Sequence, residues 1–309
     1  MPELPEVEII KRHLAPAVEG RTLVRMEVLD ARWCEPAAPV EVEDAVSGRR
    51  VEALSRRGKY LVWELEDDVF LVIHLRMTGN LLLSAGGDSR PHLRVRMELD
   101  SRDSVLFTDP RRFGTGVVLL GEDALEDYFA SRLGVEPLGP GFTTDALRAL
   151  ARNRRQPVKA FLLTQERIAG VGNIYADEAL FRARIHPLRP VGTLKRTQLE
   201  ALRDAVIESL NEGIDARGAT IDDFRNPDGA SGSFQTRFLV HLREGEPCPR
   251  CGRTIVKMRA AGRGTYVCEG CQPKPRARRA ARSPSAPSGR GPLQSRATPP
   301  RRRAPTRSS

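Results

Sequence analysis

The first residues of the chain carry groups that can act together on a carbon centre. We expect Met1 to be removed because the second residue, Pro2, is small, and removal would leave a secondary amine as the amino terminus. An α-amino group has a pKa near ~8 against ~10.4 for lysine, so much more of it is nucleophilic at neutral pH. Attack by a secondary amine on an aldehydic or glycosidic carbon gives a cationic iminium, which favours elimination. Glu3 and Glu6 lie close enough in sequence to move protons beside this amine.

Four of the five cysteines form two close pairs, Cys248-Pro-Arg-Cys251 and Cys268-Glu-Gly-Cys271, with 16 residues between them. Such pairs supply four thiolates for one tetrahedral Zn²⁺. The alternative, two disulfides, needs an oxidising compartment, whereas the acidic start of the chain does not resemble a secretory signal. Because cysteine fills all four positions, the zinc is predicted to be structural. The fifth cysteine, Cys34, is predicted to be a packed, inert thiol.

The elements that must position these groups follow from periodicity. Residues 4–17 have apolar side chains at helical spacing, and 20–120 contains short β-branched runs that predict an antiparallel sandwich or barrel. Strands are predicted at 60–66, 69–75, 93–99, 105–108 and 116–120, and helices at 144–151, 157–165, 174–183 and 195–212. Gly170-Val-Gly-Asn173 precedes one helix, where it can serve as a turn and cap or as a phosphate seat. Between the cysteine pairs, 254–259 and 265–267 predict a hairpin whose turn, 260–264, projects Arg263.

The positive charge of the chain lies at its carboxy-terminal end. The 309 residues have a formal net charge of +10, yet 272–309 holds 11 basic residues, eight prolines and no acidic residue. The remaining residues, 1–271, have a net charge of −1. We predict a disordered tail that either only solubilises the protein or holds it near DNA by counterion release. No apolar run approaches the ~18 residues of a membrane span, so a cytoplasmic protein without membrane contact is expected.

Six motifs occur in a fixed order: Pro2-Glu-Leu-Pro-Glu-Val-Glu8, Gly58-Lys-Tyr-Leu61, His74-Leu-Arg-Met-Thr-Gly79, Asp109-Pro-Arg-Arg-Phe-Gly114, Gly170-Val-Gly-Asn-Ile-Tyr-Ala176 and the four-cysteine finger. Together they closely resemble the bacterial formamidopyrimidine-DNA glycosylases, bifunctional enzymes that repair 8-oxoguanine. The resemblance extends from residue 2 to residue 271. It implies an α+β multidomain fold with an N-terminal helix and antiparallel β-sandwich, a helix-two-turn-helix domain and a β-hairpin zinc finger. The expected divisions are 2–130 for the catalytic sandwich, 131–142 for a linker, 143–224 for the helical domain, 225–271 for a lesion-capping loop and finger, and 272–309 for the tail.

The same resemblance implies residue roles. Pro2 would displace the damaged base and form a Schiff base, assisted by the acid Glu3 and by Lys59, with β,δ-elimination at the abasic site following. Glu6 would be a further carboxylate of the active site. Phosphates of double-stranded damaged DNA would be held by His74, Asn173 and Arg263, and the hole left by the extruded base would be filled by Met77, Arg111 and Phe113. A bacterial, DNA-associated monomer is implied.

Arg76 departs from the resembling family, which usually has glycine at this position, and segment 217–238 resembles the family's lesion-capping loop in general form. Two rival functions fit part of the pattern. One rival is an endonuclease VIII-like glycosylase for oxidised pyrimidines, which shares Pro2-Glu3 but typically departs from the next residues, Leu4 to Glu8. The other is a zinc-dependent damage-binding protein without turnover, which would not need Pro2, Glu3 and Lys59.

Overall fold

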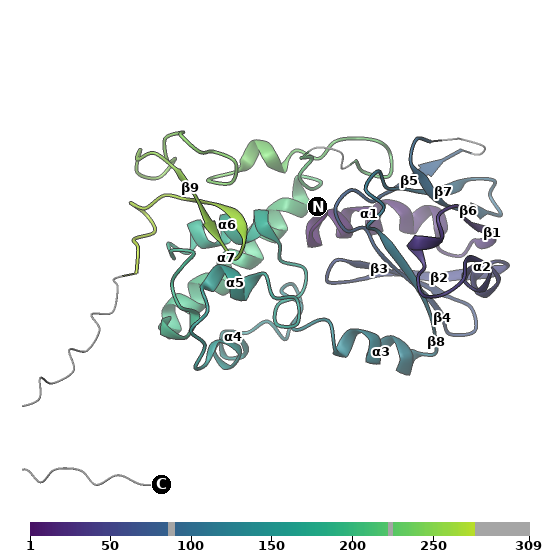
Figure 1. Cartoon of the computed structure of the whole chain (residues 1–309), viewed down its shortest axis with the longest axis horizontal. Helices are drawn as coiled ribbons and strands as arrows, with labels where there is room; N and C mark the ends of the chain where they lie inside the picture. Colours follow the sequence, from purple (N-terminus) through teal and green to yellow (C-terminus); the bar gives the residue numbers. More distant parts are fainter. Residues whose placement is uncertain (86–89, 222–224, 276–309) are drawn as a thin grey trace, which may run out of the picture. The chain divides into compact units, whose positions relative to one another are not determined.

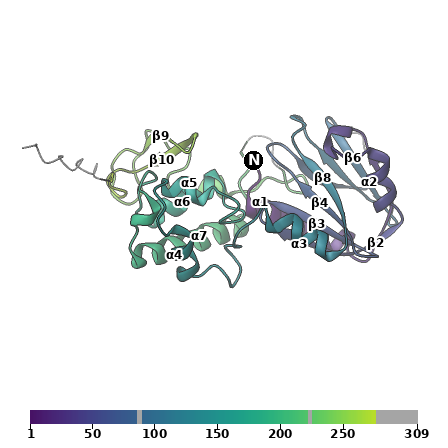
Figure 2. The same ribbon diagram turned by 60° about the horizontal axis from the view of Figure 1, so that its bottom comes forward.

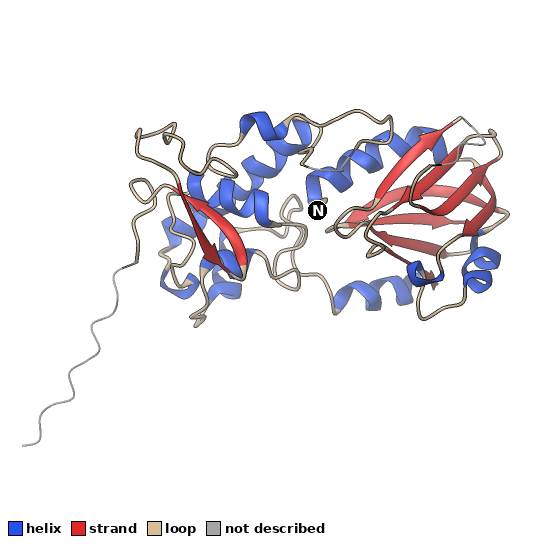
Figure 3. Cartoon of the chain, turned by 45° about the horizontal axis from the view of Figure 1, so that its top comes forward, coloured by secondary structure: helices blue, strands red, loops and turns tan. Residues whose placement is uncertain are grey.

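The computed structural model describes residues 1–85, 90–221 and 225–275. The predicted disorder and DNA binding of the basic tail fall on residues that lie almost entirely outside this part of the chain. Figures 1 and 3 show strands and helices largely segregated, with the sheet strands in one body and the longer helices of the second half of the chain in another. In the described ranges, none of the helices combines the length and the apolar character that crossing a bilayer requires.

Eight antiparallel strands build the first body, in the spatial order β5-β7-β6-β1-β2-β3-β4-β8. Their bounds are β1 Thr22–Val28, β2 Arg49–Arg57, β3 Tyr60–Leu65, β4 Val69–His74, β5 Asn80–Ser84, β6 Leu93–Leu99, β7 Ser104–Thr108 and β8 Thr115–Leu120. β1 and β2 pair through only two residue pairs. The strands therefore divide into two halves, β5-β7-β6-β1 and β2-β3-β4-β8. Phe107 of the first half and Trp63 of the second lie in the same buried cluster, so the two halves face each other as a sandwich. This confirms the predicted fold class of the amino-terminal part.

Three helices cover the sandwich. α1 (Leu4–Val18) buries Ile10 and Leu14 in the sandwich core, and Gly20, with φ 77°, follows its end. α2 (Pro39–Val46) adds Val46 to the same core. α3 (Glu122–Ala130) packs Phe129 against the outer face of β3 and β4; Figure 2 shows it beside β3. The short helices α2, α3 and the 3₁₀ turn η1 (Ala31–Trp33) were not predicted; α2 and η1 lie within the stretch 20–120, in which β-branched runs dominate the pattern.

Four helices form the second body: α4 (Thr144–Ala151), α5 (Val158–Leu162), α6 (Asn173–Arg182) and α7 (Arg196–Asp215), with the 3₁₀ turn η2 (Val191–Thr193) before α7. They share one apolar cluster, which also includes Leu4 and Ile9 from the start of the chain. The prediction of a helix over 157–165 was too long. α5 ends at Leu162 because the side chain of Gln165 folds the next residues into a loop, accepting from Gly170 N at 2.9 Å and donating to Val171 O at 2.9 Å.

The carboxy-terminal part contains the 3₁₀ turn η3 (Phe234–Arg237) and the hairpin of β9 (Val256–Ala260) and β10 (Arg263–Val267). The predicted five-residue turn at 260–264 was wrong. Only Ala261 and Gly262 form the turn, with φ values of 52° and 72°, and both being positive is the pattern of a tight type I′ hairpin turn. Arg263 therefore begins β10 and pairs with Ala260 instead of standing within the turn.

Candidate active site

The amino-terminal segment is fixed against helix α6 and the loop before it. Leu4 N donates to Gly170 O at 3.1 Å, and Ile174 N donates to Glu3 Oε1 at 3.1 Å. The Glu3 carboxylate thus takes a first-turn N–H of α6 that would otherwise be free for a phosphate, and the positive end of a helix favours this placement. The other oxygen, Oε2, is buried and has no hydrogen-bond partner among the described residues. An acceptor is therefore left available beside Pro2.

Two glycines of the Gly170-Val-Gly172 motif permit this close approach. A β carbon on Gly172 would lie 2.2 Å from Glu3 Cδ, and one on Gly170 would lie 2.6 Å from Leu4 Cδ1. Gly170 also has φ 81°, a conformation that glycine adopts without strain. The motif therefore brings the backbone of the helical domain against the chain start.

Glu6 joins three segments of the chain. Its Oε2 accepts from Glu3 N at 2.8 Å, and its Oε1 accepts from the Tyr175 hydroxyl at 2.7 Å and from Ala219 N at 2.8 Å. Burial, followed by the nearby charge of Glu3, raises the pKa of Glu6 above its ordinary value. The pKa of Tyr175 is raised as well, chiefly by burial and next by the charge of Glu6. Glu6 thus places the chain start, α6 and the base of segment 217–238 around one carboxyl group.

A cavity of about 180 Å³ opens beside these groups. Its walls include residues from the chain start, a sandwich loop, the helical domain and the finger: Pro2, Glu3, Glu6, Met77, Asn173 and Arg263. Six of the ten residues predicted for catalysis and DNA contact therefore meet at one hollow, although up to 261 positions separate them in sequence.

The charge of Lys59 interacts with the charges of two residues that line this cavity, Glu3 and Arg263. Lys59 is 5% exposed and occupies the Gly58-Lys59 turn between β2 and β3. Burial lowers its pKa, the charge of Glu3 opposes that shift, and the charge of Arg263 adds to it. A lowered pKa leaves more of this amine unprotonated than in an ordinary lysine.

His74, the last residue of β4, is neutral at physiological pH. Burial, Arg76 and Lys59 together lower its pKa to about 3. Arg76 N donates to His74 Nδ1 at 2.9 Å, which leaves the ring proton on Nε2 as a donor. Arg76 itself has φ 54°, in the left-handed region that favours glycine.

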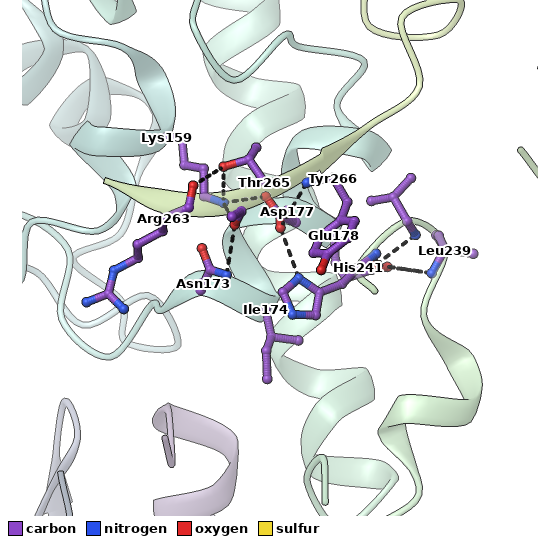
Figure 4. Close-up of polar contacts among 12 residues, drawn as sticks. Lys159, Asn173, Ile174, Asp177, Glu178, Leu239, His241, Arg263, Thr265 and Tyr266 are labelled. Atoms are coloured by element: carbon purple, nitrogen blue, oxygen red, sulfur yellow. Dashed lines mark hydrogen bonds and ion pairs between the residues drawn. The ribbon is translucent and has the colours of Figure 1, made fainter. Parts of the chain in front are cut away.

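The finger hairpin is held against the helical domain by a buried polar network (Figure 4). Lys159 Nζ donates to Asp177 Oδ1 at 2.7 Å, to Thr265 Oγ1 at 2.8 Å and to Gly264 O at 3.2 Å. Asn173 Nδ2 donates to the same carbonyl at 3.1 Å. The two predicted phosphate contacts, Asn173 and Arg263, are thereby placed next to each other, and Arg263 remains exposed.

Sequence reasoning missed this network. Asp177 Oδ2 also contacts His241 Nδ1 at 2.9 Å, and the Glu178 carboxylate accepts backbone N–H groups of residues 239–241 at 2.9–3.1 Å. The available signal was Asp177-Glu178 within the otherwise apolar stretch Ile174–Phe181, and Lys159 within Val158–Leu162. Charged residues in a helix that is apolar all round are buried, and buried charges need partners.

The remaining predicted DNA contacts, Arg111 and Phe113, lie in the loop between β7 and β8, outside the residues that line the cavity. Phe113 is 51% exposed and the Arg111 guanidinium lies 4.9 Å from the centre of its ring. Both side chains are therefore available to a partner.

The four predicted zinc ligands converge at the base of the finger. All four Sγ atoms of Cys248, Cys251, Cys268 and Cys271 lie within 4.8 Å of one another. The Cys251–Cys268 and Cys248–Cys271 separations of 3.4 and 3.9 Å bracket the ~3.8 Å edge of a ZnS₄ tetrahedron with Zn–S bonds of about 2.3 Å. They are far from the ~2.05 Å of a disulfide. The thiolates thus fit one structural zinc, as predicted, while Cys34 is buried in the sandwich.

Comparison with known proteins gives matches along most of the chain. Three family models match: the formamidopyrimidine-DNA glycosylase N-terminal domain at 1–116, its H2TH domain at 133–225, and the zinc finger found in FPG and IleRS at 245–274. The formamidopyrimidine-DNA glycosylases of Chloroflexus aurantiacus and Thermus thermophilus are each 43% identical, covering 88% of this chain and 98% of each relative.

Comparison with solved structures indicates the same family. The crystal structure of MutM (Fpg) from Thermus thermophilus matches with a TM-score of 0.79 and 42% identity, covering 88% of this chain and 98% of that one. A Lactococcus lactis Fpg in complex with DNA that contains an abasic site matches with a TM-score of 0.82 and 33% identity, covering 88% of this chain and 100% of that one. Fold and site together define a zinc-finger DNA glycosylase. The chain belongs to the formamidopyrimidine-DNA glycosylase family, which confirms the resemblance seen in its motifs.

Proposed function

We propose that this protein excises oxidised purines, namely 8-oxoguanine and formamidopyrimidines, from double-stranded DNA and then cleaves the abasic site as a lyase. The observation that carries the proposal is the single cavity at which Pro2, Glu3 and Glu6 meet Asn173 and Arg263. A nucleophile with two carboxylates, next to an amide and a guanidinium, suits attack on a sugar carbon between two phosphates.

The proposed chemistry begins after Met1 is removed, because the Pro2 nitrogen is otherwise an amide. The secondary amine attacks C1′ of the damaged nucleotide, the N-glycosidic bond breaks, and the base leaves with a proton. Opening of the sugar ring gives an iminium between Pro2 and C1′. Loss of a C2′ proton then expels the 3′ phosphate, and a second elimination expels the 5′ phosphate. Glu3 is suited to the proton transfers because its Oε2 atom has no hydrogen-bond partner in the described part of the chain.

Other residues would hold the DNA. Asn173 and Arg263 would contact the phosphates that flank the extruded nucleotide, and Lys59 and His74 would contribute a cation and a neutral N–H donor. Met77, Arg111 and Phe113 would fill the hole in the duplex, since apolar wedges stack between bases and arginine offers donors to a base edge. The zinc would fold the finger that carries Arg263. We place the enzyme in the bacterial cytoplasm on DNA, as a monomer.

Borohydride trapping tests the proposal. The purified protein is incubated with an 8-oxoguanine·C duplex and with a thymine-glycol duplex in borohydride, and the cross-linked peptide is mapped. A covalent adduct at Pro2, formed faster on 8-oxoguanine, is expected. Faster trapping on thymine glycol would favour the pyrimidine enzyme. No adduct on either duplex, or one that Pro2→Gly leaves undiminished, would overturn the mechanism.

A further inference from the structure

Two loops leave the same end of the sandwich side by side. Residues 75–79 connect β4 to β5, and residues 109–114 connect β7 to β8. β4 pairs with β8 through His74 and Thr115, and β5 pairs with β7 through Asn80 and Thr108. These four residues flank the two loops, so both loops span the same pair of strand ends. One carries Met77, and the other carries Arg111 and Phe113.

Asp109 binds the backbone of its own loop from within. It is 1% exposed, and its Oδ2 accepts from Phe113 N at 2.8 Å and from Gly114 N at 2.7 Å, while Oδ1 accepts from Arg111 N at 3.2 Å. Three N–H donors to one buried carboxylate fix the curvature of this loop, because releasing the buried Gly114 N would leave a polar group without a partner.

Thr78 connects the two loops. Its hydroxyl donates to Asp109 Oδ1 in a short hydrogen bond and accepts from Arg111 N at 3.3 Å. Beneath them, both loops rest on one ring: a β carbon on Gly79 or on Gly114 would lie 2.9 or 2.4 Å from Phe107 Cζ. Neither loop can shift at this point without moving the other or displacing that ring.

We propose that Asp109 and Thr78 are positioning residues that make the two loops enter the duplex as one unit, with the Arg111 backbone N–H bonded to both of them. The inference rests on the proposed function, because it requires Met77, Arg111 and Phe113 to fill the hole. It adds that the three side chains act together. Met77 cannot be inserted while Phe113 stays out, since Thr78 follows Met77 directly and is bonded to the carboxylate that holds Phe113 N.

A double-mutant cycle tests the coupling. Met77→Ala, Phe113→Ala and the double variant are compared in the natural chain and in Thr78→Val, which keeps the shape of Thr78 but removes its hydroxyl. The readout is single-turnover excision of 8-oxoguanine opposite C. In the natural chain, the double variant is expected to lose much less than the product of the single losses, because either change already prevents insertion of the unit. In the Thr78→Val background, the loss of rate in the double variant should equal the product of the losses caused by Met77→Ala and Phe113→Ala alone.

Two further measurements separate positioning from folding. Thr78→Ser retains the hydroxyl and should restore the non-multiplicative behaviour, and Thr78→Val should reduce discrimination between C and A opposite the lesion more than Thr78→Ser does. Losses that multiply equally in both backgrounds would overturn the coupling. A natural chain that forms no adduct at Pro2 would instead overturn the proposed function, so the two failures are distinguishable.

Discussion

The Glu3 carboxyl group occupies the space in which a side chain on Gly172 would begin, with Glu3 Cδ only 2.2 Å from that β carbon position. Residues 169 positions apart in sequence are thus in direct contact. The proposed catalytic acid is positioned by the turn that begins helix α6, and not by the sandwich. The candidate active site therefore forms where the chain start meets the helical part of the protein.

Gly172→Ala should abolish most activity without unfolding the protein. The added methyl group must displace Glu3, which breaks its bond with Ile174 N, and a shift of about 1 Å at a catalytic group costs on the order of 10²-fold in rate. Single-turnover excision measures the loss. Gly141→Ala, whose β carbon would make an ordinary 3.4 Å contact with Val135 Cγ2, is the matched control. Equal rates for the two variants would contradict this role of Gly172.

The contribution of Glu6 to the stability of the protein should fall as pH rises. Burial, followed by the charge of Glu3, raises its pKa above the ordinary value of 4.5. A group whose pKa is raised by folding contributes stability below the unfolded-state value and loses it as pH rises through the folded-state value. The difference in free energy of unfolding, natural chain minus Glu6→Gln, should therefore fall from pH 4.5 upward, as measured by urea denaturation.

Glu8, on the same helix, supplies a control of opposite sign. Burial would raise its pKa, but hydrogen bonds from Arg12 and Arg56 outweigh burial and lower it below 4.5. Its contribution is therefore present above pH 4.5 and lost as pH falls, so the same difference for Glu8→Gln should grow as pH rises. Two curves of the same sign would contradict the assignment.

Lys159→Met should destabilise the protein strongly. Lys159 and Asp177 are both 0% exposed, and removal of one partner of a buried ion pair leaves an uncompensated charge, at a cost of about 3–5 kcal/mol. Adding Asp177→Asn removes that charge, so the double variant should recover part of the loss. Urea unfolding of the three proteins measures the effect, and a double variant less stable than the single would show that Asp177 acts mainly through His241 and Tyr266.

The sequence predicted the parts of the site better than their contacts. Motifs indicated Pro2, Glu3, Asn173 and the cysteines because each occurs in a local pattern. Periodicity predicted α1, α6 and most of the strands for the same reason. The bonds of Glu3 to Ile174, of Glu6 to Ala219 and of Lys159 to Thr265 link residues more than 100 positions apart. A single sequence contains no local signal for such pairs.

Removal of zinc should unfold the finger and leave the sandwich intact. Cys248 and Cys268 share a small core with Phe181 and Ile255, and the thiolates would repel one another without the metal. Both tryptophans of the chain, Trp33 and Trp63, lie in the separate sandwich core. A chelator should therefore weaken DNA binding while the tryptophan emission maximum stays constant. A red shift of that emission would contradict the independence of the two parts.

The basic tail should add affinity for DNA without adding selectivity or speed. Residues 1–271 carry a net charge of −1, so the 11 basic residues of 272–309 account for the positive charge of the whole chain. Each phosphate that the tail neutralises should add about 0.9 to the slope of log Kobs against log salt concentration. Deleting 273–309 should therefore reduce that slope and weaken binding to undamaged duplex at low salt.

Single-turnover excision of 8-oxoguanine should be nearly unchanged by the same deletion, because no residue of the cavity lies beyond Arg263. A tail of equal length in which glutamine replaces every arginine is the matched control, since it keeps the length and the prolines but removes almost all of the charge. It should behave like the deletion. Equal salt slopes for the natural and deleted chains would refute tethering by the tail and leave it a solubilising segment.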